Sequence, residues 1–518
     1  FLLKLYRSQV ICMKKNTNPI TSVRRAGALL HISSLPGEYG VGTMGKEARE
    51  FADFLKKSGF SYWQILPLVQ TGMGDSPYQS VFAASGNPLF IDPDVLAEKG
   101  LVTEREAAEN KIKNDGTAHY GEAYEKRFSL LRKAFARFDR TDAEFIAFSK
   151  TEFLDYALFM AIRKNYGNAE FRFWEKPLRF HQAEALEKFR AENADEVDFW
   201  LFVQFEFYRQ WEELKAYVNG LGIKIIGDIP LYMAYDSADV WANPRLFKLN
   251  KNLTRRKVAG VPPDYFSATG QLWGNPVYDW KVHEAEGFSW WIERIRLAFS
   301  LYDVVRIDHF RGFDRYFEID AKAETAMGGK WKKGPGIALF DAAKAALGDL
   351  PFIAEDLGSL DAGVYRLMKK TGYPGMKVLQ FAFDGNKDNP YLPQNISENS
   401  VCYTGTHDND TLVGFLNNLQ DRERKNLNAI LVPLLREAKI PAHVSTSRAE
   451  AAAMRALALS CRSGLCVLPV QDILLTGGET RMNVPSVASG NWRYRLKKPM
   501  PQKLAEELKK LLEKYARA

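Results

Sequence analysis

Short apolar runs that end in polar or charged side chains recur along the whole chain, with helical stretches between them. Eight such runs are Ala28–His31, Tyr62–Leu66, Lys224–Ile229, Asp303–Asp308, Phe352–Glu355, Met376–Phe381, Val401–Thr404 and Leu465–Pro469. Strands that alternate with helices form βα units and a parallel sheet. The pattern therefore predicts an α/β fold, a (β/α)8 TIM barrel with large, mostly helical insertions between its strands.

The spacing of the runs is uneven, and the widest interval, from about residue 67 to residue 222, is far longer than one helix and its loops require. Its middle part is rich in Ala, Glu, Lys, Phe and Leu at helical spacing. This predicts an inserted helical subdomain over about 90–220. Residues 242–280 instead carry Gly, Pro, Asn and aromatic side chains without periodicity, so we expect a long active-site loop there.

The two ends of the chain give simpler expectations. Residues 1–20 are expected to be a poorly ordered N-terminal extension, with Met13 as the true start, and residues 21–518 to form a single catalytic domain. Lys4 and Arg7 interrupt the apolar character of the first residues, which predicts neither a signal peptide nor a membrane span. The last expected helix carries Leu504, Leu508, Leu511 and Tyr515 on one face.

Cysteine content and charge limit the class of protein. The 518 residues include four cysteines, Cys12, Cys402, Cys461 and Cys466, without metal-ligand or CxxC spacing. Such usage is typical of reduced thiols in a cytoplasmic protein. The 71 basic and 63 acidic residues are spread through the chain, so we expect no nucleic-acid partner. The sequence contains no HExxH motif, and no Walker A or GxGxxG pattern follows an expected strand, so we expect neither a metal nor another cofactor.

Acidic side chains lie at the C-terminal ends of several of the expected strands. Asp228, Asp308 and Glu355 end their runs, and Asp408 follows another run within GTHDND. A single Asp at such a position more often caps the next helix. In a TIM barrel, however, the C-terminal ends of the strands surround the active site. Glycoside chemistry needs two carboxyl groups there, one protonated and one ionised, and the set predicts a glycosidase-like site.

The residues next to these acids indicate their protonation states. Arg306 precedes Asp308 by two positions and therefore faces the same side of its strand. We expect its cation to depress the pKa of Asp308 and to hold this group ionised, as a nucleophile must be, although a structural ion pair would look the same. Glu355 follows an apolar run. Burial there would raise its pKa and keep it protonated, as a general acid must be. His407 could bond either a sugar hydroxyl or its own loop.

Three motifs, VRIDHFRG (305–312), AEDLG (354–358) and GTHDND (405–410), resemble in this order those of the 4-α-glucanotransferases, or amylomaltases, which are related to the α-amylases. The resemblance extends over almost the whole chain. It includes AGALLHISSLPGEYGVG near the start, GDSPYQS, GDIPLYM, GVPPDYFSATGQLWGNPVYDW, and RMNVP and SGNWRYR near the end.

The resemblance implies the transfer of a segment of a 1,4-α-D-glucan to the 4-hydroxyl of another glucan or of glucose, by a retaining double displacement. It implies that Asp308 forms the covalent intermediate, that Glu355 is the general acid and base, and that Asp408 stabilises the transition state. The donors would be maltooligosaccharides and longer α-1,4-glucans. The substrate-binding residues it implies are Tyr78, Asp228, Tyr265, Phe266, Gln271, Trp273, Arg306, Asp384, His407 and Asn483.

Two alternatives use the same residues. An α-glucan hydrolase of the amylase type would employ the same three acids, and a catalytically inactive glucan-binding protein would keep the cleft. The inactive protein would be expected to lack Asp308, Glu355 or Asp408, and all three are present.

Overall fold

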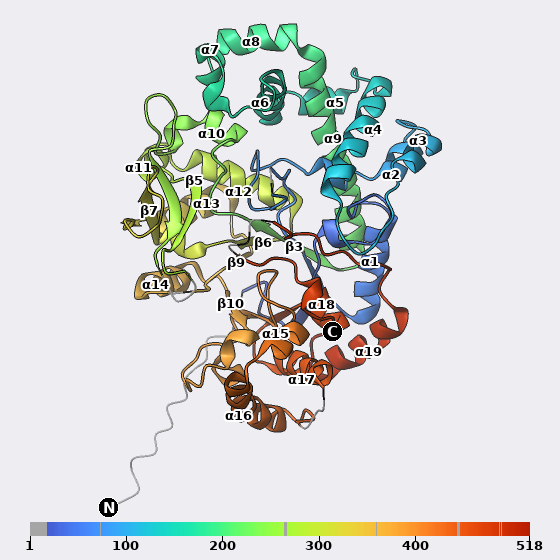
Figure 1. Cartoon of the computed structure of the whole chain (residues 1–518), viewed down its shortest axis with the longest axis vertical. Helices are drawn as coiled ribbons and strands as arrows, with labels where there is room; N and C mark the ends of the chain where they lie inside the picture. Colours follow the sequence, from blue (N-terminus) through green and yellow to red (C-terminus); the bar gives the residue numbers. More distant parts are fainter. Residues whose placement is uncertain are drawn as a thin grey trace, which may run out of the picture.

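The computed structural model describes residues 18–518 except 73, 264–266, 359, 443–445, 486 and 488. Its centre is a closed barrel of parallel strands in the order β1-β12-β11-β10-β9-β6-β3-β2 (Figure 1). The strands are β1 (Arg25–Leu29), β2 (Tyr62–Gln64), β3 (Lys224–Ile229), β6 (Val304–Ile307), β9 (Phe352–Ala354), β10 (Gly375–Val378), β11 (Ser400–Tyr403) and β12 (Leu465–Pro469). Each predicted run contributes one strand, and the predicted (β/α)8 barrel is confirmed.

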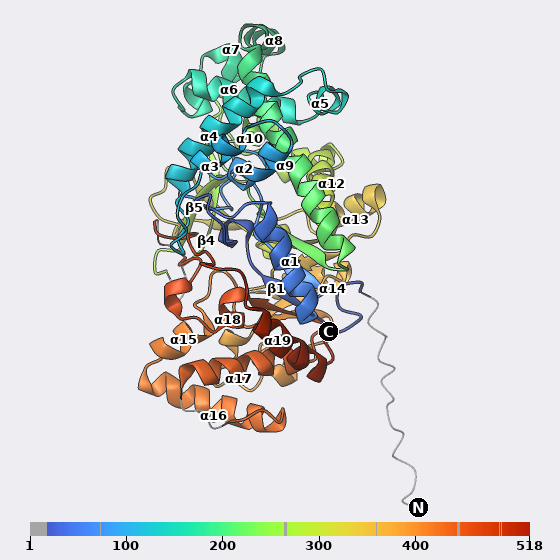
Figure 2. The ribbon, with the colours of Figure 1, turned by 90° about the vertical axis from the view of Figure 1, so that its right-hand side faces the viewer.

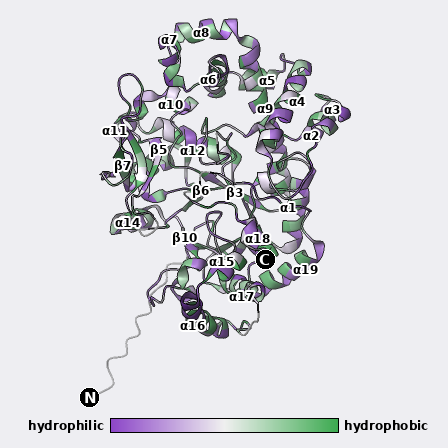
Figure 3. Ribbon diagram, viewed as in Figure 1, coloured by the Kyte–Doolittle hydropathy of each residue, from purple (hydrophilic) through white to green (hydrophobic). Residues whose placement is uncertain are grey.

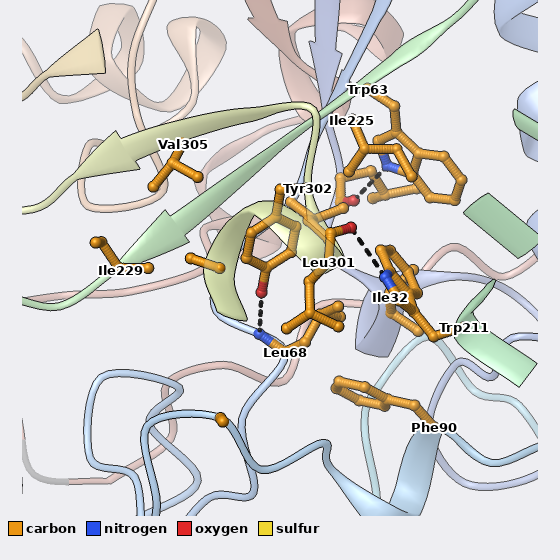
Figure 4. Close-up of a cluster of buried hydrophobic side chains, with 14 of the residues drawn as sticks. Ile32, Trp63, Leu68, Phe90, Trp211, Ile225, Ile229, Leu301, Tyr302 and Val305 are labelled. Carbon is orange, nitrogen blue, oxygen red and sulfur yellow. Dashed lines mark hydrogen bonds between the residues drawn. The ribbon is translucent and has the colours of Figure 1, made fainter. Parts of the chain in front are cut away.

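The strands read as continuous apolar runs because both of their faces are buried. In β3, Ile226 packs inside the barrel, whereas Ile225 and Ile229 pack outward against the helices. Gly227 allows the outer layer to approach closely, since a Cβ at this position would lie 2.1 Å from the Tyr302 ring. Figure 4 shows Tyr302 packed among these outer side chains, with its hydroxyl accepting a 3.3 Å hydrogen bond from the Leu68 amide.

Helices fill the long interval between β2 and β3, where a helical insertion was expected. They are α2 (Pro93–Glu98), α3 (Glu104–Glu109), α4 (Tyr120–Arg137), α5 (Ala143–Phe148), α6 (Phe153–Asn165), α7 (Lys176–Arg179), α8 (Ala183–Glu192) and α9 (Ala194–Gly220). Helices α5 to α8 lie at one end of the molecule, opposite α15 to α17 (Figures 1 and 2). The division of this range into a separate subdomain stays a prediction.

The segment 242–280, expected to be a loop, contains two strands, β4 (Lys257–Val261) and β5 (Gln271–Pro276). They join β7 (Arg315–Asp320) and β8 (Lys330–Lys333) in an antiparallel sheet of order β5-β4-β7-β8. The expectation was wrong because the strands are short and Gly-containing, and because β4 pairs with β7 far along the chain, with Lys257 opposite Asp320. The two loops that flank β6 are thus joined by one sheet.

The remaining helices cover the barrel and its far end. They are α1 (Lys46–Ser58), α10 (Ala238–Ala242), α11 (Trp280–Ala285), α12 (Ser289–Leu301), α13 (Ile337–Leu347), α14 (Ala362–Thr371), α15 (Leu412–Asn418), α16 (Asp421–Glu437), α17 (Ser447–Ser460), α18 (Val470–Leu474) and α19 (Gln502–Lys514). Helix α16 is largely hydrophilic (Figure 3) and buries only Leu427, Leu431 and Leu435. In the described part of the chain, none of the helices has the length and apolarity needed to span a membrane.

The two ends of the chain differ in detail from expectation. Helix α19 buries Ala505, Leu508 and Leu512, whereas Leu504, Leu511 and Tyr515 are only partly buried. The apolar stripe therefore lies slightly to one side of the predicted face. Residues 1–17 of the predicted extension lie outside the described residues. Ile20, at its end, is only 2% exposed and packs inside the barrel, so the packed structure begins earlier than expected.

Candidate active site

The predicted acids gather at one mouth of the barrel. Asp228 lies within β3, Asp308 directly follows β6, and Glu355 directly follows β9. Strand register explains their meeting, because Asp228 pairs with Arg306 of β6, and Ile307 pairs with Ala354 of β9. The C-terminal ends of neighbouring parallel strands thus bring these carboxylates together.

One guanidinium group, that of Arg306, connects three of the carboxylates. Its Nη1 lies 2.5 Å from Oδ2 of Asp228 and 3.2 Å from Oδ1 of Asp308, and its Nη2 lies 3.9 Å from Oε2 of Glu355. Burial alone would lower the pKa of Arg306, but the surrounding carboxylates raise it well above its ordinary value. Arg306 is therefore a fixed cation beneath the mouth of the barrel.

The expected depression of the Asp308 pKa is not found. Burial raises the pKa of Asp308 above its ordinary value, and the cation of Arg306 opposes this shift without overcoming it. Burial likewise raises the pKa of Asp228 to about 7, again against the attraction of Arg306. The prediction was wrong because one cation is shared among three acids in a desolvated site, and sequence does not show desolvation.

Glu355 is held by two backbone amides. Its Oε2 accepts a 2.5 Å hydrogen bond from the N–H of His309, and its Oε1 accepts one of 3.2 Å from the N–H of Leu357. Burial raises the pKa of Glu355, whereas Arg306 and the two amides oppose the rise. The predicted direction of this shift is confirmed.

His309 is a site residue that the sequence reasoning missed. Its backbone is left-handed, with φ of 51°, and this turn directs its N–H at Glu355. Its half-buried ring contacts the ring of Trp273 edge-on, with centroids 5.0 Å apart. The motif VRIDHFRG contained the residue, but no local pattern reveals that the position after Asp308 needs a positive φ.

Asp408 lies across the mouth from these groups, on the loop after β11. Its Oδ1 accepts a 2.6 Å hydrogen bond from Nδ2 of Asn483 and lies 3.4 Å from Nε2 of His407. Its backbone carbonyl accepts a 2.6 Å hydrogen bond from Arg481. His407 is buried, and burial lowers its pKa so that the ring is neutral at neutral pH. The carboxylate of Asp408 is thus oriented by neighbours from two segments.

Tyr78 joins the two halves of the site. Its hydroxyl donates a 2.8 Å hydrogen bond to Oδ2 of Asp228, and its ring stacks on His407 with centroids 5.3 Å apart. Trp492 packs against both rings, with centroids 5.8 Å from each. Trp492 belongs to the SGNWRYR motif but was not selected from the sequence, since an isolated Trp is usually a core residue.

The other predicted binding residues are distributed unevenly. Gln271 and Trp273 lie on β5, where the Trp273 indole donates a 3.1 Å hydrogen bond to Gln271. The Trp273 ring contacts the site through the ring of His309. Asp384 is exposed and accepts a hydrogen bond from the Asn386 amide of its own loop, and it is not among the groups around Arg306. Tyr265 and Phe266 lie outside the described residues.

Among the described residues, no group of three or more His, Cys, Asp or Glu side chains is arranged to hold a metal ion. The mouth of the barrel instead offers the buried carboxyl group of Asp228, the partly buried ones of Asp308 and Glu355, all with raised pKa values, and one fixed cation. Such a set can donate a proton from one carboxyl group while another attacks or stabilises a developing positive charge.

Comparisons with known proteins identify close relatives. A family model described as 4-alpha-glucanotransferase matches residues 30–501. The 4-alpha-glucanotransferase of Clostridium butyricum is 44% identical over 495 residues, which cover 94% of this chain and 100% of that protein. The 4-alpha-glucanotransferase of Thermus thermophilus is 45% identical over 498 residues, covering 93% of this chain and 96% of that protein.

Solved structures show the same relationship. The structure of the amylomaltase from Streptococcus agalactiae in complex with acarbose superposes with a TM-score of 0.90 at 38% identity, covering 96% of this chain and 100% of that one. The amylomaltase from Corynebacterium glutamicum superposes with a TM-score of 0.78 at 18% identity, covering 96% of this chain and 76% of that one, and here the likeness concerns the fold alone.

Proposed function

Because the chain belongs to the 4-alpha-glucanotransferase family, we propose that Asp308, Glu355 and Asp408 carry out its transfer reaction. The activity is that of a 4-alpha-glucanotransferase, a retaining enzyme that moves segments of α-1,4-glucans. The observation that carries the assignment of residues is the contact of the single Arg306 guanidinium with both Asp308 and Glu355, which brings the two carboxyl groups to one reacting point.

In the first half of the proposed reaction, the carboxylate of Asp308 attacks the anomeric carbon of the donor glucan. The bond from this carbon to the glycosidic oxygen breaks, and Glu355 transfers its proton to that oxygen, which leaves as the 4-hydroxyl of the released segment. The raised pKa of Glu355 favours the protonated form that this step needs. An ester between Asp308 and the glucosyl unit results.

In the second half, the ionised Glu355 accepts the proton of an acceptor 4-hydroxyl, whose oxygen attacks the same anomeric carbon. The ester bond breaks, Asp308 leaves as a carboxylate, and two inversions give net retention. Glu355 is suited to both duties because Arg306 and the two backbone amides stabilise its ionised form, while burial stabilises its protonated form.

Asp408 is assigned to the positive charge that develops on the sugar ring. Its side chain is 46% exposed, yet the hydrogen bond from Asn483 holds its Oδ1, and the ring of His407 lies 3.4 Å away. A carboxylate fixed in advance near a developing cation stabilises the transition state without reorganising at that moment. The ring of Tyr78 and the neutral imidazole of His407 form a stacked surface for the donor sugar beside it.

The outcome of the second half depends on which acceptor reaches the glucosyl-enzyme. We assign to strand β5, with Gln271 and Trp273, the exclusion of water and the placement of a sugar hydroxyl. Maltooligosaccharides and longer α-1,4-glucans are the proposed donors, and glucose is a proposed acceptor. A cytoplasmic location is proposed from the free, buried Cys402, Cys461 and Cys466.

Incubation with maltotriose tests the function directly. A transferase produces glucose together with a ladder of maltooligosaccharides longer than maltotriose, visible by thin-layer or anion-exchange chromatography. A hydrolase of the amylase type would give glucose and maltose without the ladder, and a glucan-binding protein would leave maltotriose unchanged. Either of these two outcomes contradicts the function.

A further inference from the structure

The motif AGALLHISSLPG contains a buried histidine, His31, that has no part in the mechanism above. It lies just beyond β1 and is 5% exposed, and Ser34, three residues later, is 1% exposed. Burial lowers the pKa of His31 to about 3, with a smaller contribution from nearby His407, so the imidazole is neutral. Its ring packs edge-on against Phe90, with centroids 5.2 Å apart.

Three polar atoms of this segment lack a partner. Nδ1 of His31 and the Oγ atoms of Ser33 and Ser34 are buried, and none of them has a hydrogen bond to any described residue. Buried polar atoms in folded proteins nearly always bind a protein group or an ordered water. Of these three residues, His31 and Ser34 line one pocket, which indicates a shared water site.

A pocket of about 30 Å³ meets both residues. Its lining includes His31 and Ser34, together with Thr406, His407 and Asn409 of the loop after β11. Gln471 and Asp472 also line the pocket. A water needs roughly 10–15 Å³ of such space and two to four polar partners. The pocket therefore has the size and the polar lining for about two water molecules.

The position of the pocket in the barrel connects it to catalysis. It lies at the C-terminal ends of β1, β12 and β11, which are neighbours in the barrel. The loop that lines it carries His407 and Asp408, and Arg481, which also lines the pocket, binds the Asp408 carbonyl through its guanidinium. Contacts within the pocket would thus support the same loop from the side of β1.

We propose that this pocket is a bound-water site in which water links His31 and Ser34 to the loop 405–410, and that His31 is thereby a positioning residue for Asp408. Water bridges hold polar groups nearly as well as direct hydrogen bonds. A displaced catalytic group reduces the rate even when the change lies away from the reacting atoms. The inference rests on the role given to Asp408 in the proposed function.

Replacement of the histidine tests its positioning role. His31→Phe removes both ring nitrogens and keeps an aromatic ring against Phe90, and we expect kcat for maltotriose disproportionation to fall about tenfold with KM changed less than about twofold. His31→Asn keeps a polar atom near the place of Nδ1 and should recover most of the loss. A merely structural histidine would show no such split between kcat and KM and no such rescue.

His283 supplies a matched control. It is another buried histidine, 1% exposed, whose pKa burial lowers to about 4, and it does not line the pocket. His283→Phe should leave kcat unchanged. Wild-type kcat in His31→Phe, or an equal loss in His283→Phe, would overturn the proposal.

A crystal structure at a resolution that shows ordered water provides the second measurement. In the wild-type protein, water should lie within hydrogen-bonding distance of His31 and Ser34, and a pocket without ordered water overturns the proposal. Asp408→Asn separates this inference from the function on which it rests. Retained activity in that variant contradicts the role of Asp408, whereas lost activity together with a fully active His31→Phe contradicts only the role of His31.

Discussion

The backbone N–H of His309 donates a 2.5 Å hydrogen bond to Oε2 of Glu355, and His309 adopts a left-handed backbone to do so. A β-branched residue is strained in this conformation, whereas glycine adopts it freely. His309→Gly and His309→Val both lose the ring contact with Trp273, so their difference reports the backbone alone. We expect kcat of the Val variant to be about tenfold below that of the Gly variant in steady-state assays. Equal values would show that the backbone turn does not position Glu355.

Replacement of Asp308 by Asn should abolish transfer. The amide cannot form the ester intermediate, and loss of a nucleophile reduces kcat by at least about a thousandfold. The measurement is the rate of ladder formation from maltotriose. Circular dichroism and the melting temperature of the variant should match those of the wild type, because the side chain keeps its size. Retained transfer with an intact fold would refute the assignment.

Glu355→Gln should separate the two carboxyl roles. Release of a glucan requires protonation by Glu355, whereas release of fluoride from α-maltosyl fluoride does not. The variant should therefore lose transfer from maltotriose by about 100- to 10,000-fold, yet still form a covalent maltosyl-enzyme with the fluoride, detectable by mass spectrometry. Asp308→Asn should form no such adduct. An Asp308→Asn adduct, or none with Glu355→Gln, would contradict the roles.

The pH profile should respond to Asp228. Its carboxylate lies beside Arg306 and near Asp308 and Tyr78, and burial raises its pKa to about 7. Below about pH 7 this carboxyl group is therefore protonated, and its ionisation near pH 7 adds a negative charge beside Arg306 and Asp308. Asp228→Asn keeps the neutral form at every pH, so an inflection of kcat/KM near pH 7 in the wild type should disappear in the variant, while the acidic limb keeps its position. An inflection near pH 7 that persists in the variant would contradict the coupling.

Trp273 should control the choice of acceptor. Its ring contacts His309 at the site, whereas its neighbour on β5, Leu272, is 41% exposed. Trp273→Ala should raise the fraction of glucosyl-enzyme captured by water, measured as new reducing ends per transfer event from maltotriose, by about tenfold. Leu272→Ala should not change this fraction. Similar effects of the two changes would show that strand integrity, and not the ring, excludes water.

The barrel could be predicted because the apolar runs of buried parallel strands are local features, as in KIIGDI and VVRID. Strand β4 was missed because its partner β7 lies about sixty residues away, and pairing at such a distance leaves no local pattern. The pKa of Asp308 was predicted with the wrong sign because its dominant cause is desolvation. Burial of Glu355 was predicted correctly because its apolar approach, Phe352 to Ala354, is visible in sequence.

Residues whose roles depend on contacts between distant segments could not be found this way. The stack of Tyr78 on His407 joins positions more than three hundred residues apart. Trp492, which packs on both, carries no signal that separates it from a core residue. The sequence reasoning reached Asp408 through its motif alone, and the structure adds the hydrogen bond from Asn483 that holds its carboxylate.

The sheet β5-β4-β7-β8 has a consequence for how such enzymes can diversify. Its strands come from the two loops on either side of β6, and β4 pairs directly with β7. A graft of residues 242–280 from another family member would bring a β4 without the β7 that matches it. Segments 242–280 and 315–333 must therefore match each other. Chimaeras that exchange both segments together should fold, whereas chimaeras that exchange only one of them should not.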